Sequence, residues 1–338
     1  MDNRFSIVMQ GSILDKSGNL DASIVENIKI VRCNFMSSEF IISTWDVCDN
    51  IKYKIKELAD KLSLIVIYNE DPGGITSHDN LVTSNINRMI VSTLNGIKIS
   101  KREFVIKIRT DSYLYDKKTV SNMRHIIGSK IELNRDPKYS IFENYMINCC
   151  LFARDSRGYI PYLFHPGDIC LVGTRNDMLL LFDVPLADES IFSNIARTCF
   201  LSFMKYVPEQ YIWVRCIENK MGEVVFRGNG FYDESLVALS EKFYVNNFIV
   251  LSPNQLGFSW PKYQVVYKNK GLYSVYSIND WKALYNKYNK SYFEVNNRLI
   301  TMKKFITIVG TIYFFARTSV LKIPFLRRIA IKLFRKRG

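Results

Sequence analysis

Short apolar strands alternate with helical segments through the first 112 residues of this chain. The predicted strands are 5–9, 40–43, 64–68 and 104–108, and the predicted helices between them are 21–34, 50–61 and 85–96. This order is typical of a mostly parallel sheet with helices on both faces, because parallel neighbours need a crossover that a helix supplies. We therefore expect an α/β fold built on a Rossmann-type sheet.

The carboxyl ends of these four strands carry small and polar residues, and open parallel sheets bind ligands beyond those ends. The candidate ligand-binding residues there are Gln10, Gly11, Thr44, Asn69, Asp71, Arg109, Asp111 and Ser112. No GxGxxG sequence follows the first strand, and no GxxxxGK[ST] sequence occurs. The pattern favours a nucleotide crevice of another kind, into which the fourth strand delivers the carboxylate of Asp111.

Asn87 and Arg88 lie on the helix that follows the third strand. A guanidinium at this place could contact a base or a phosphate. The alternative is an ordinary solvated helix face. In the same way, Arg109 and Asp111 share a face if their strand continues, so they could serve a ligand or form an ion pair with each other.

The second half of the chain is less regular. Strands are expected at 142–152, 169–173 and 248–251, and helices at 176–182, 189–206 and 236–244. Three residues in this half are candidates for proton transfer or acceptor binding: His165, Asp168 and Glu209. Asp168 follows a Pro-Gly turn and Glu209 follows Pro208, so capping and turn formation are the alternatives for both. We see no boundary before about residue 300 and expect residues 1–300 to form one domain.

Several sequence blocks resemble the WavE lipopolysaccharide-synthesis family and, more broadly, glycosyltransferases of the GT-A fold. The blocks are QGSI from residue 10, IISTW at 41–45, FVIKIRTDS at 104–112, HPGDICLVGT at 165–174 and PEQYIW at 208–213. They occur in order over roughly residues 3–260. The resemblance implies a GT-A-like sheet and transfer of a sugar from a nucleotide-sugar donor to a lipid-linked or lipopolysaccharide O-antigen glycan.

One block departs from the broader GT-A pattern. The usual D-x-D sequence reads Arg109-Thr110-Asp111, so a basic residue stands in place of the first acid. Asp111 could still hold a divalent cation, Mg²⁺ or Mn²⁺, with one carboxylate oxygen and the donor phosphates. We expect any metal requirement to be weak. Two other functions stay open from the sequence: a nucleotidyltransferase of sugar activation, and a binding protein with a degenerate donor site.

The last 38 residues, 301–338, contain ten Lys and Arg residues and no acid, out of a net charge of +14 for the whole chain. Residues 305–316 form an apolar run of about 12 residues, shorter than the roughly 20 that a spanning helix needs. Pro324 then opens a second helix with an apolar and a basic face. The residues expected to contact a membrane are Phe314, Phe315, Leu326, Arg327, Arg328, Ile329, Leu333 and Phe334.

We expect this tail to bind an anionic membrane surface without crossing it, because it combines basic and apolar side chains. Nucleic acid is the less suitable partner, since a phosphate-tracking arm has little need of so many apolar residues. A helix packed on the domain, with no membrane role, is the other alternative. The seven cysteines show no metal-ligand spacing, and the first residues do not resemble a signal peptide. The expected location is therefore the cytoplasmic face of the inner membrane.

Overall fold

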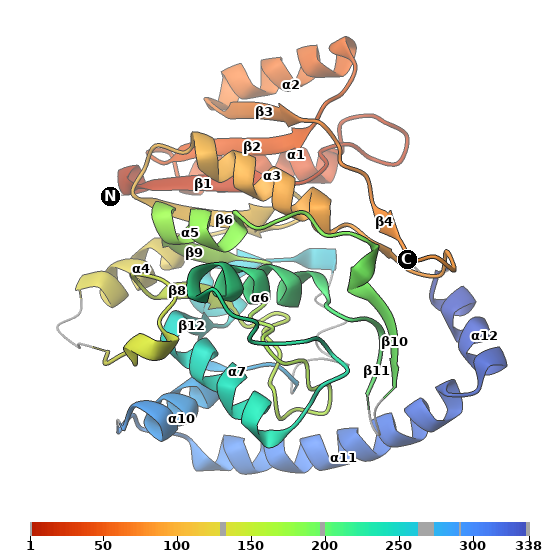
Figure 1. Ribbon diagram of the computed structural model, residues 1–338. Coiled ribbons are helices and arrows are strands. Elements are labelled where there is room, and N and C mark those ends of the chain that lie inside the picture. Colours follow the sequence, from red (N-terminus) through yellow and green to blue (C-terminus); the bar gives the residue numbers. More distant parts are fainter. Residues whose placement is uncertain (1, 129–132, 197–199, 263–273, 291, 336–338) are drawn as a thin grey trace.

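The computed structural model describes residues 2–128, 133–196, 200–262, 274–290 and 292–335 (Figure 1). Its centre is a seven-stranded sheet in the order β12-β8-β9-β6-β1-β2-β3. The strands are β1 (Phe5–Gln10), β2 (Glu39–Trp45), β3 (Ile65–Asn69), β6 (Phe104–Arg109), β8 (Met146–Cys149), β9 (Leu171–Thr174) and β12 (Phe248–Leu251). The expected α/β class is confirmed.

Most neighbouring strands of this sheet are parallel. β1 pairs in parallel with β2 and β6, β2 with β3, and β8 with β12. β9 is the exception, because it runs antiparallel to both β6 and β8. This reversal matters for the site, since the residues that precede β9 lie at the edge where β6 ends.

Helices cover both faces of the sheet. They are α1 (Ala22–Asn34), α2 (Asp49–Leu62), α3 (Ile86–Ile99), α4 (Lys118–Gly128), α5 (Arg175–Phe182), α6 (Pro208–Met221), α7 (Glu234–Asn247), α8 (Pro253–Leu256) and α10 (Ile278–Asn289). Side chains alternate between two cores, as they must in a strand. Val8 packs with α3, α5, α6 and α7, whereas Ile7 and Met9 pack with α1, α2 and α4.

The prediction of a helix at 189–206 is wrong. That stretch forms a short 3-10 turn, Glu189–Ile191, and a hairpin of β10 (Phe192–Ala196) and β11 (Leu201–Met204). Pro208, expected to follow a helix end, instead occupies the first position of α6, where its missing N–H costs nothing. The strand expected at 142–152 is shortened to β8. Two further pairs of short antiparallel strands lie outside the main sheet: β4 (Ile75–Thr76) with β5 (Thr83–Ser84), and β7 (Tyr113–Leu114) with β13 (Phe258–Ser259).

The tail forms two helices, α11 (Asn297–Leu321) and α12 (Pro324–Arg335), of which α11 runs along one side of the molecule (Figure 1). α11 continues through Gly310 and Arg317, so the expectation of an apolar segment too short to cross a membrane is wrong. Its 25 residues extend about 37 Å at 1.5 Å per residue. By length and composition, α11 could cross a membrane.

Candidate active site

A buried ion pair lies beneath the carboxyl end of β6. Lys107 of β6 is fully buried, and its Nζ lies 2.7 Å from Oδ2 of Asp168, while it also donates to the Asp168 backbone carbonyl. Because β9 is antiparallel to β6, Asp168, which precedes β9, lies beside the part of β6 that carries Lys107. The charge of Asp168 is therefore matched by a buried cation, as a buried carboxylate requires.

Two backbone segments, 152–154 and 164–168, hold this region in an unusual conformation. Phe152 and Phe164 have φ of 64° and 51°, which bulky residues rarely adopt. Gly167 has φ of 77°, and a Cβ there would lie 3.0 Å from the backbone of Leu151 and Ala153, so only glycine fits. The Arg154 N–H donates to the carbonyl of His165 at 2.9 Å and ties the two segments together. Strained backbone of this kind clusters at functional sites.

Glu209 stands in the first turn of α6, next to this pair of segments. Its side chain is 19% exposed, and its Oε2 lies 3.5 Å from Nε2 of His165. Burial, together with the negative charge of Asp168, raises the pKa of Glu209 to about 7. A carboxyl group with this pKa can exchange a proton near neutral pH.

His165 is the buried neighbour of Glu209. Burial and the positive charge of Arg154 lower the pKa of His165 to about 3, so the imidazole is neutral in the working range of an enzyme. Neutral His165 can orient Glu209 but carries no charge of its own. The structure thus brings together all three predicted residues, His165, Asp168 and Glu209.

Arg109 and Asp111 form the ion pair that the sequence left as one alternative. Nε and Nη2 of Arg109 donate to the two oxygens of Asp111 at 2.8 and 3.0 Å. Burial alone would raise the pKa of Asp111, but hydrogen bonds from Arg109 and Trp260 and the charge of Lys262 bring it below its usual value. The Arg109 guanidinium also lies 5.2 Å from the Trp260 ring. The end of β6 is therefore a fixed, charged platform.

Five other predicted residues line the ends of β1, β2, β3 and β6. All five form hydrogen bonds with other residues of the protein. Oε1 of Gln10 accepts from Ser92, and the N–H of Gly11 donates to the carbonyl of Ser43. Nδ2 of Asn69 donates to the carbonyl of Thr44, and the Ser112 hydroxyl donates to the carbonyl of Arg109. Except for Gly11, all are almost fully buried. These residues shape the floor of the sheet edge.

The remaining predicted donor residues lie on or beside α3. Arg88 donates to both oxygens of Asp71 at 2.7 Å, and this contact lowers the pKa of Asp71. Asn87 is buried and exchanges two hydrogen bonds with the backbone of Ala187, at 3.0 and 2.8 Å. Both polar atoms of the Asn87 amide thus bind the protein itself. Arg88 and Asp71 form a partly exposed charged pair near the end of β3.

The predicted site residues form one group at the sheet edge and a second around Glu209, joined through β6. Lys107, in the second group, precedes Arg109 by two residues on the same strand, about 6.6 Å along its axis. The charge of Lys107 also acts on Glu209. The two groups therefore flank the end of one strand.

A divalent cation finds a poor set of ligands at Asp111. Both of its carboxylate oxygens already accept hydrogen bonds from Arg109. Within the described parts of the chain, no group of three or more His, Cys, Asp or Glu side chains could hold a metal ion. The residues present therefore do not fit a tightly bound metal, and no step below uses one.

Three residues of this region were not singled out from the sequence. Lys107 carried a readable signal, because one charged residue in the apolar strand FVIKI must find a buried partner. Trp260 carried a weak one, because it lies in a stretch rich in aromatic residues. Arg154 carried none, because its contacts depend on the fold of segments distant in sequence.

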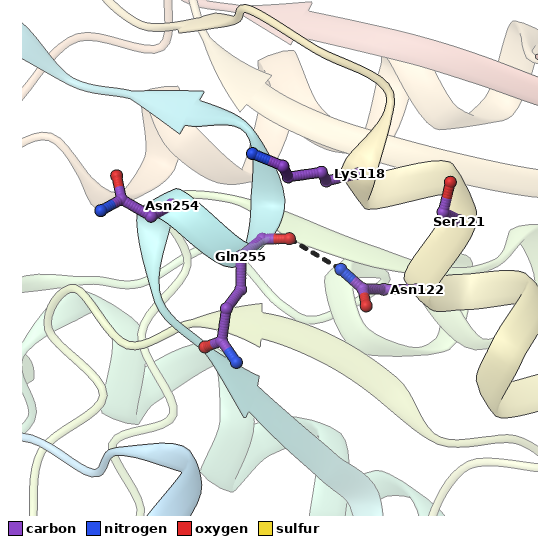
Figure 2. Close-up of a pocket in the computed structure, with 5 residues that line it drawn as sticks. All are labelled: Lys118, Ser121, Asn122, Asn254 and Gln255. Atoms are coloured by element: carbon purple, nitrogen blue, oxygen red, sulfur yellow. Dashed lines mark hydrogen bonds between the residues drawn. The ribbon is translucent and has the colours of Figure 1, made fainter.

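Two surface hollows lie elsewhere. One, of about 370 Å³, lies between α4 and α8 and is lined by Lys118, Ser121, Asn122, Asn254 and Gln255 (Figure 2). Figure 2 shows Asn122 donating to the backbone oxygen of Gln255, and Lys118 pairs with Asp116 at 2.9 Å. The other, of about 390 Å³, lies between α2 and β3. Neither hollow includes a predicted site residue.

The predicted membrane residues divide by face. Phe315 and Ile329 are exposed, as is Arg328, while Leu326 and Arg327 are half-buried. Phe314 faces the domain, where its ring stacks on Tyr159 at 5.5 Å between centroids. Of Leu333 and Phe334 the structure describes the helical backbone of α12 alone.

The sequence matches the family model described as WavE lipopolysaccharide synthesis over residues 5–314. No curated protein matches it. Solved structures that resemble it share the fold class at low identity, and in the three described next the matched part is at most 66% of the other chain.

Three of these structures illustrate the range. The S. aureus TarS fragment 1–349 in complex with UDP-GlcNAc is 15% identical, over 73% of this chain and 56% of that one, with a TM-score of 0.33. A cytidylyltransferase from Leptospira borgpetersenii is 13% identical over 54% and 66%, with a TM-score of 0.34. The glycosyltransferase GlyE of Streptococcus pneumoniae is 9% identical over 78% and 47%, with a TM-score of 0.32. Likeness at this level carries no argument about chemistry.

Proposed function

The chain belongs to the WavE lipopolysaccharide synthesis family, and we propose that within it this protein is a glycosyltransferase. It moves a sugar from a nucleotide-sugar donor to a lipid-linked or lipopolysaccharide glycan. The observation that carries the proposal is the cluster of Glu209, His165 and the buried Lys107–Asp168 pair, in which Oε2 of Glu209 lies 3.5 Å from Nε2 of His165. The raised pKa of Glu209 supports its role as a general base.

The proposed reaction is a single displacement with inversion. Glu209 accepts the proton of an acceptor hydroxyl, the hydroxyl oxygen forms a bond to the anomeric carbon, and the bond from that carbon to the donor phosphate breaks with its electron pair on the phosphate. Neutral His165, 3.5 Å away, orients the carboxylate. A base of this kind contributes typically 10²- to 10⁴-fold.

Glu209 suits this role better than Asp168. Asp168 is buried, and its carboxylate pairs with Nζ of Lys107 at 2.7 Å. Protonation of Asp168 during a turnover would leave Lys107 buried without a counter-charge, which is costly. Asp168 therefore acts as a positioning residue that also repels the charge of Glu209.

The donor belongs at the ends of β1, β2, β3 and β6. Ligands of open α/β sheets bind beyond these ends, and the Arg109–Asp111 pair supplies fixed charge there. We propose that Asp111 holds the donor, and that cationic side chains stabilise the departing phosphate.

The membrane is the proposed location, and the packing of α11 sets its orientation. Three residues of α11 at helical spacing contact the domain: Lys303, Gly310 and Phe314. Lys303 lies 2.7 Å from Asp155 and 2.8 Å from Asp280. A Cβ at Gly310 would lie 2.5 Å from the ring of Tyr159, so helix and domain are in close contact there.

The opposite face of α11 is apolar and exposed. Phe305, Ile308, Ile312 and Phe315 are 66, 61, 65 and 50% exposed. Residues 303–314 lie against the domain over about 17 Å of helix axis, and a polar domain cannot follow the helix into the hydrocarbon. We therefore propose that α11 lies in the plane of the cytoplasmic leaflet, although it is long enough to cross.

The test is a panel of nucleotide sugars and nucleoside triphosphates, read by thermal shift and by mass spectrometry of an added membrane glycan extract. The proposal expects one nucleotide sugar to raise the melting temperature and to lengthen a glycan by one sugar. Transfer should fall by about 10²-fold or more in Glu209→Gln, with donor binding kept. A shift with a triphosphate and release of pyrophosphate would instead establish nucleotidyl transfer, and a response to none of these ligands would establish a binding protein.

A further inference from the structure

Two nitrogen atoms of the Arg154 guanidinium, Nε and Nη1, are buried and have no hydrogen-bond partner among the residues that the structure describes. Two other partly buried arginines form many hydrogen bonds. The guanidinium of Arg32 donates to five backbone carbonyls, and that of Arg135 donates to four acceptors. Buried donors without a partner are rare and costly, so this one calls for a ligand.

Arg154 lies close enough to the proposed base for its charge to act on Glu209. Its backbone N–H binds His165, and its guanidinium lies 5.3 Å from the centroid of the Phe152 ring. The positive charge of Arg154 acts on both His165 and Glu209. Nδ1 of His165, itself a buried residue, is a second polar atom here that lacks a partner in the described part of the chain.

We propose that Arg154 binds a phosphate group carried by the glycan acceptor. The assignment rests on the proposed transferase function, because it places the acceptor next to Glu209. A guanidinium offers donors on several edges, and a phosphate has enough oxygens to accept from more than one of them. The cation also offsets the repulsion that a phosphate would meet from Glu209 and Asp168.

The position of Arg154 relative to α11 points to the acceptor as the source of the phosphate. Asp155, the next residue, pairs with Lys303 of α11, and Tyr159 contacts Gly310 and Phe314 of the same helix. A short stretch of chain thus runs from the proposed membrane helix to the proposed base. A phosphate that links a glycan to lipid would enter from that side, whereas the donor occupies the ends of the parallel strands.

The test measures binding of inorganic phosphate to the full-length protein by isothermal titration calorimetry. Arg154→Gln should weaken phosphate binding by about tenfold to a hundredfold, as loss of a charged hydrogen-bonding group does. Arg4→Gln is the matched control, because Arg4 is an exposed arginine already paired with Glu103. It should leave the affinity unchanged. Equal affinity in wild type and Arg154→Gln, or no phosphate binding at tens of millimolar, would overturn the proposal.

Two further arms complete the test. If Arg154→Gln does not fold, Arg154→Lys replaces it in the test. Lysine keeps the positive charge but lacks the paired N–H donors of a guanidinium, so this variant should weaken phosphate binding by a smaller factor. Unchanged affinity in this variant would also refute the site. The second arm titrates UDP, CDP and GDP. Their affinities should not change in Arg154→Gln, and a loss equal to that for phosphate would assign the subsite to the donor. Neither arm requires sugar transfer, so failure of the transferase proposal is seen separately.

Discussion

Replacement of Glu209 by Gln should make the protein less active and, above neutral pH, more stable. Gln keeps the shape of the side chain but cannot accept the acceptor proton or carry charge. The pKa of Glu209 is about 7 in the folded protein against an ordinary value of 4.5. The carboxyl group therefore holds its proton longer in the folded than in the unfolded chain.

The sign and size of both effects follow from this shift. Between pH 4.5 and 7 the folded state binds more protons, so the free energy of unfolding falls as pH rises through this window. At about 1.4 kcal/mol per pKa unit, the loss is on the order of 3 kcal/mol above pH 7. Turnover of the wild type should rise with pH along the same titration, reaching about half its plateau near pH 7 and about a tenth at pH 6.

The assay compares wild type, Glu209→Gln and His165→Gln from pH 5 to pH 9, with turnover and urea denaturation followed in parallel. Glu209→Gln should lose about 10²- to 10⁴-fold in turnover at pH 8 and gain stability there, with little gain at pH 4.5. His165→Gln should keep the rise of turnover near pH 7, because the pKa of His165 is about 3. The reasoning is refuted if the rise of turnover near pH 7 is absent in His165→Gln but present in Glu209→Gln. It is also refuted if Glu209→Gln is less stable than wild type at pH 8.

Four further outcomes are expected. Asp111→Ala should abolish donor binding, read by thermal shift, while the fold stays intact; activity within a few-fold of wild type would refute its role. EDTA should leave most of the activity, because Arg109 occupies the Asp111 carboxylate; complete loss rescued by micromolar Mn²⁺ would contradict this. Gly310→Leu should cost about 1–3 kcal/mol of stability in thermal denaturation, since its side chain would overlap Tyr159, and unchanged stability would refute the packing of α11. Phe305→Ser with Ile312→Ser should reduce flotation with anionic vesicles, whereas Tyr53→Ser, another exposed apolar site, should not; equal flotation of all three proteins would remove the membrane face.

The parallel core of the fold was predictable, because each strand there is a short apolar run followed by a clear helical period. The long strands and the helices from Phe5 to Arg109 were placed within a few residues of their observed bounds, whereas the short strands β4 and β5 were not predicted. The stretch 189–206 was not, because its apolar residues fit a helix as well as a hairpin, and pairing with a partner strand decides between them. α11 was misjudged for another reason: only the apolar run 305–316 was counted, whereas the helix extends from Asn297 to Leu321 and packs against Tyr159 at Gly310.

The site was predictable in its residues more than in their roles. His165, Asp168 and Glu209 were found through a turn and an expected helix end, and the structure brings them together. Their ranking needed the three-dimensional surroundings, because Lys107 neutralises Asp168 and leaves Glu209 as the carboxyl group with the raised pKa. Arg154 lay beyond reach of the sequence, since a missing hydrogen bond has no sequence pattern.

Lys107 also bears on how the polypeptide reaches its native state. Strands β1, β2, β3 and β6 all lie within the first 109 residues and could associate early during synthesis. Their sheet then contains an ammonium group whose counter-ion arrives 61 residues later, with Asp168. Until β9 adds to β6, that ammonium must stay hydrated, so the early sheet cannot close its core. An excised fragment ending near residue 150 should therefore be an expanded, aggregation-prone species, and the two halves of the domain are obliged to complete their folding as one cooperative unit.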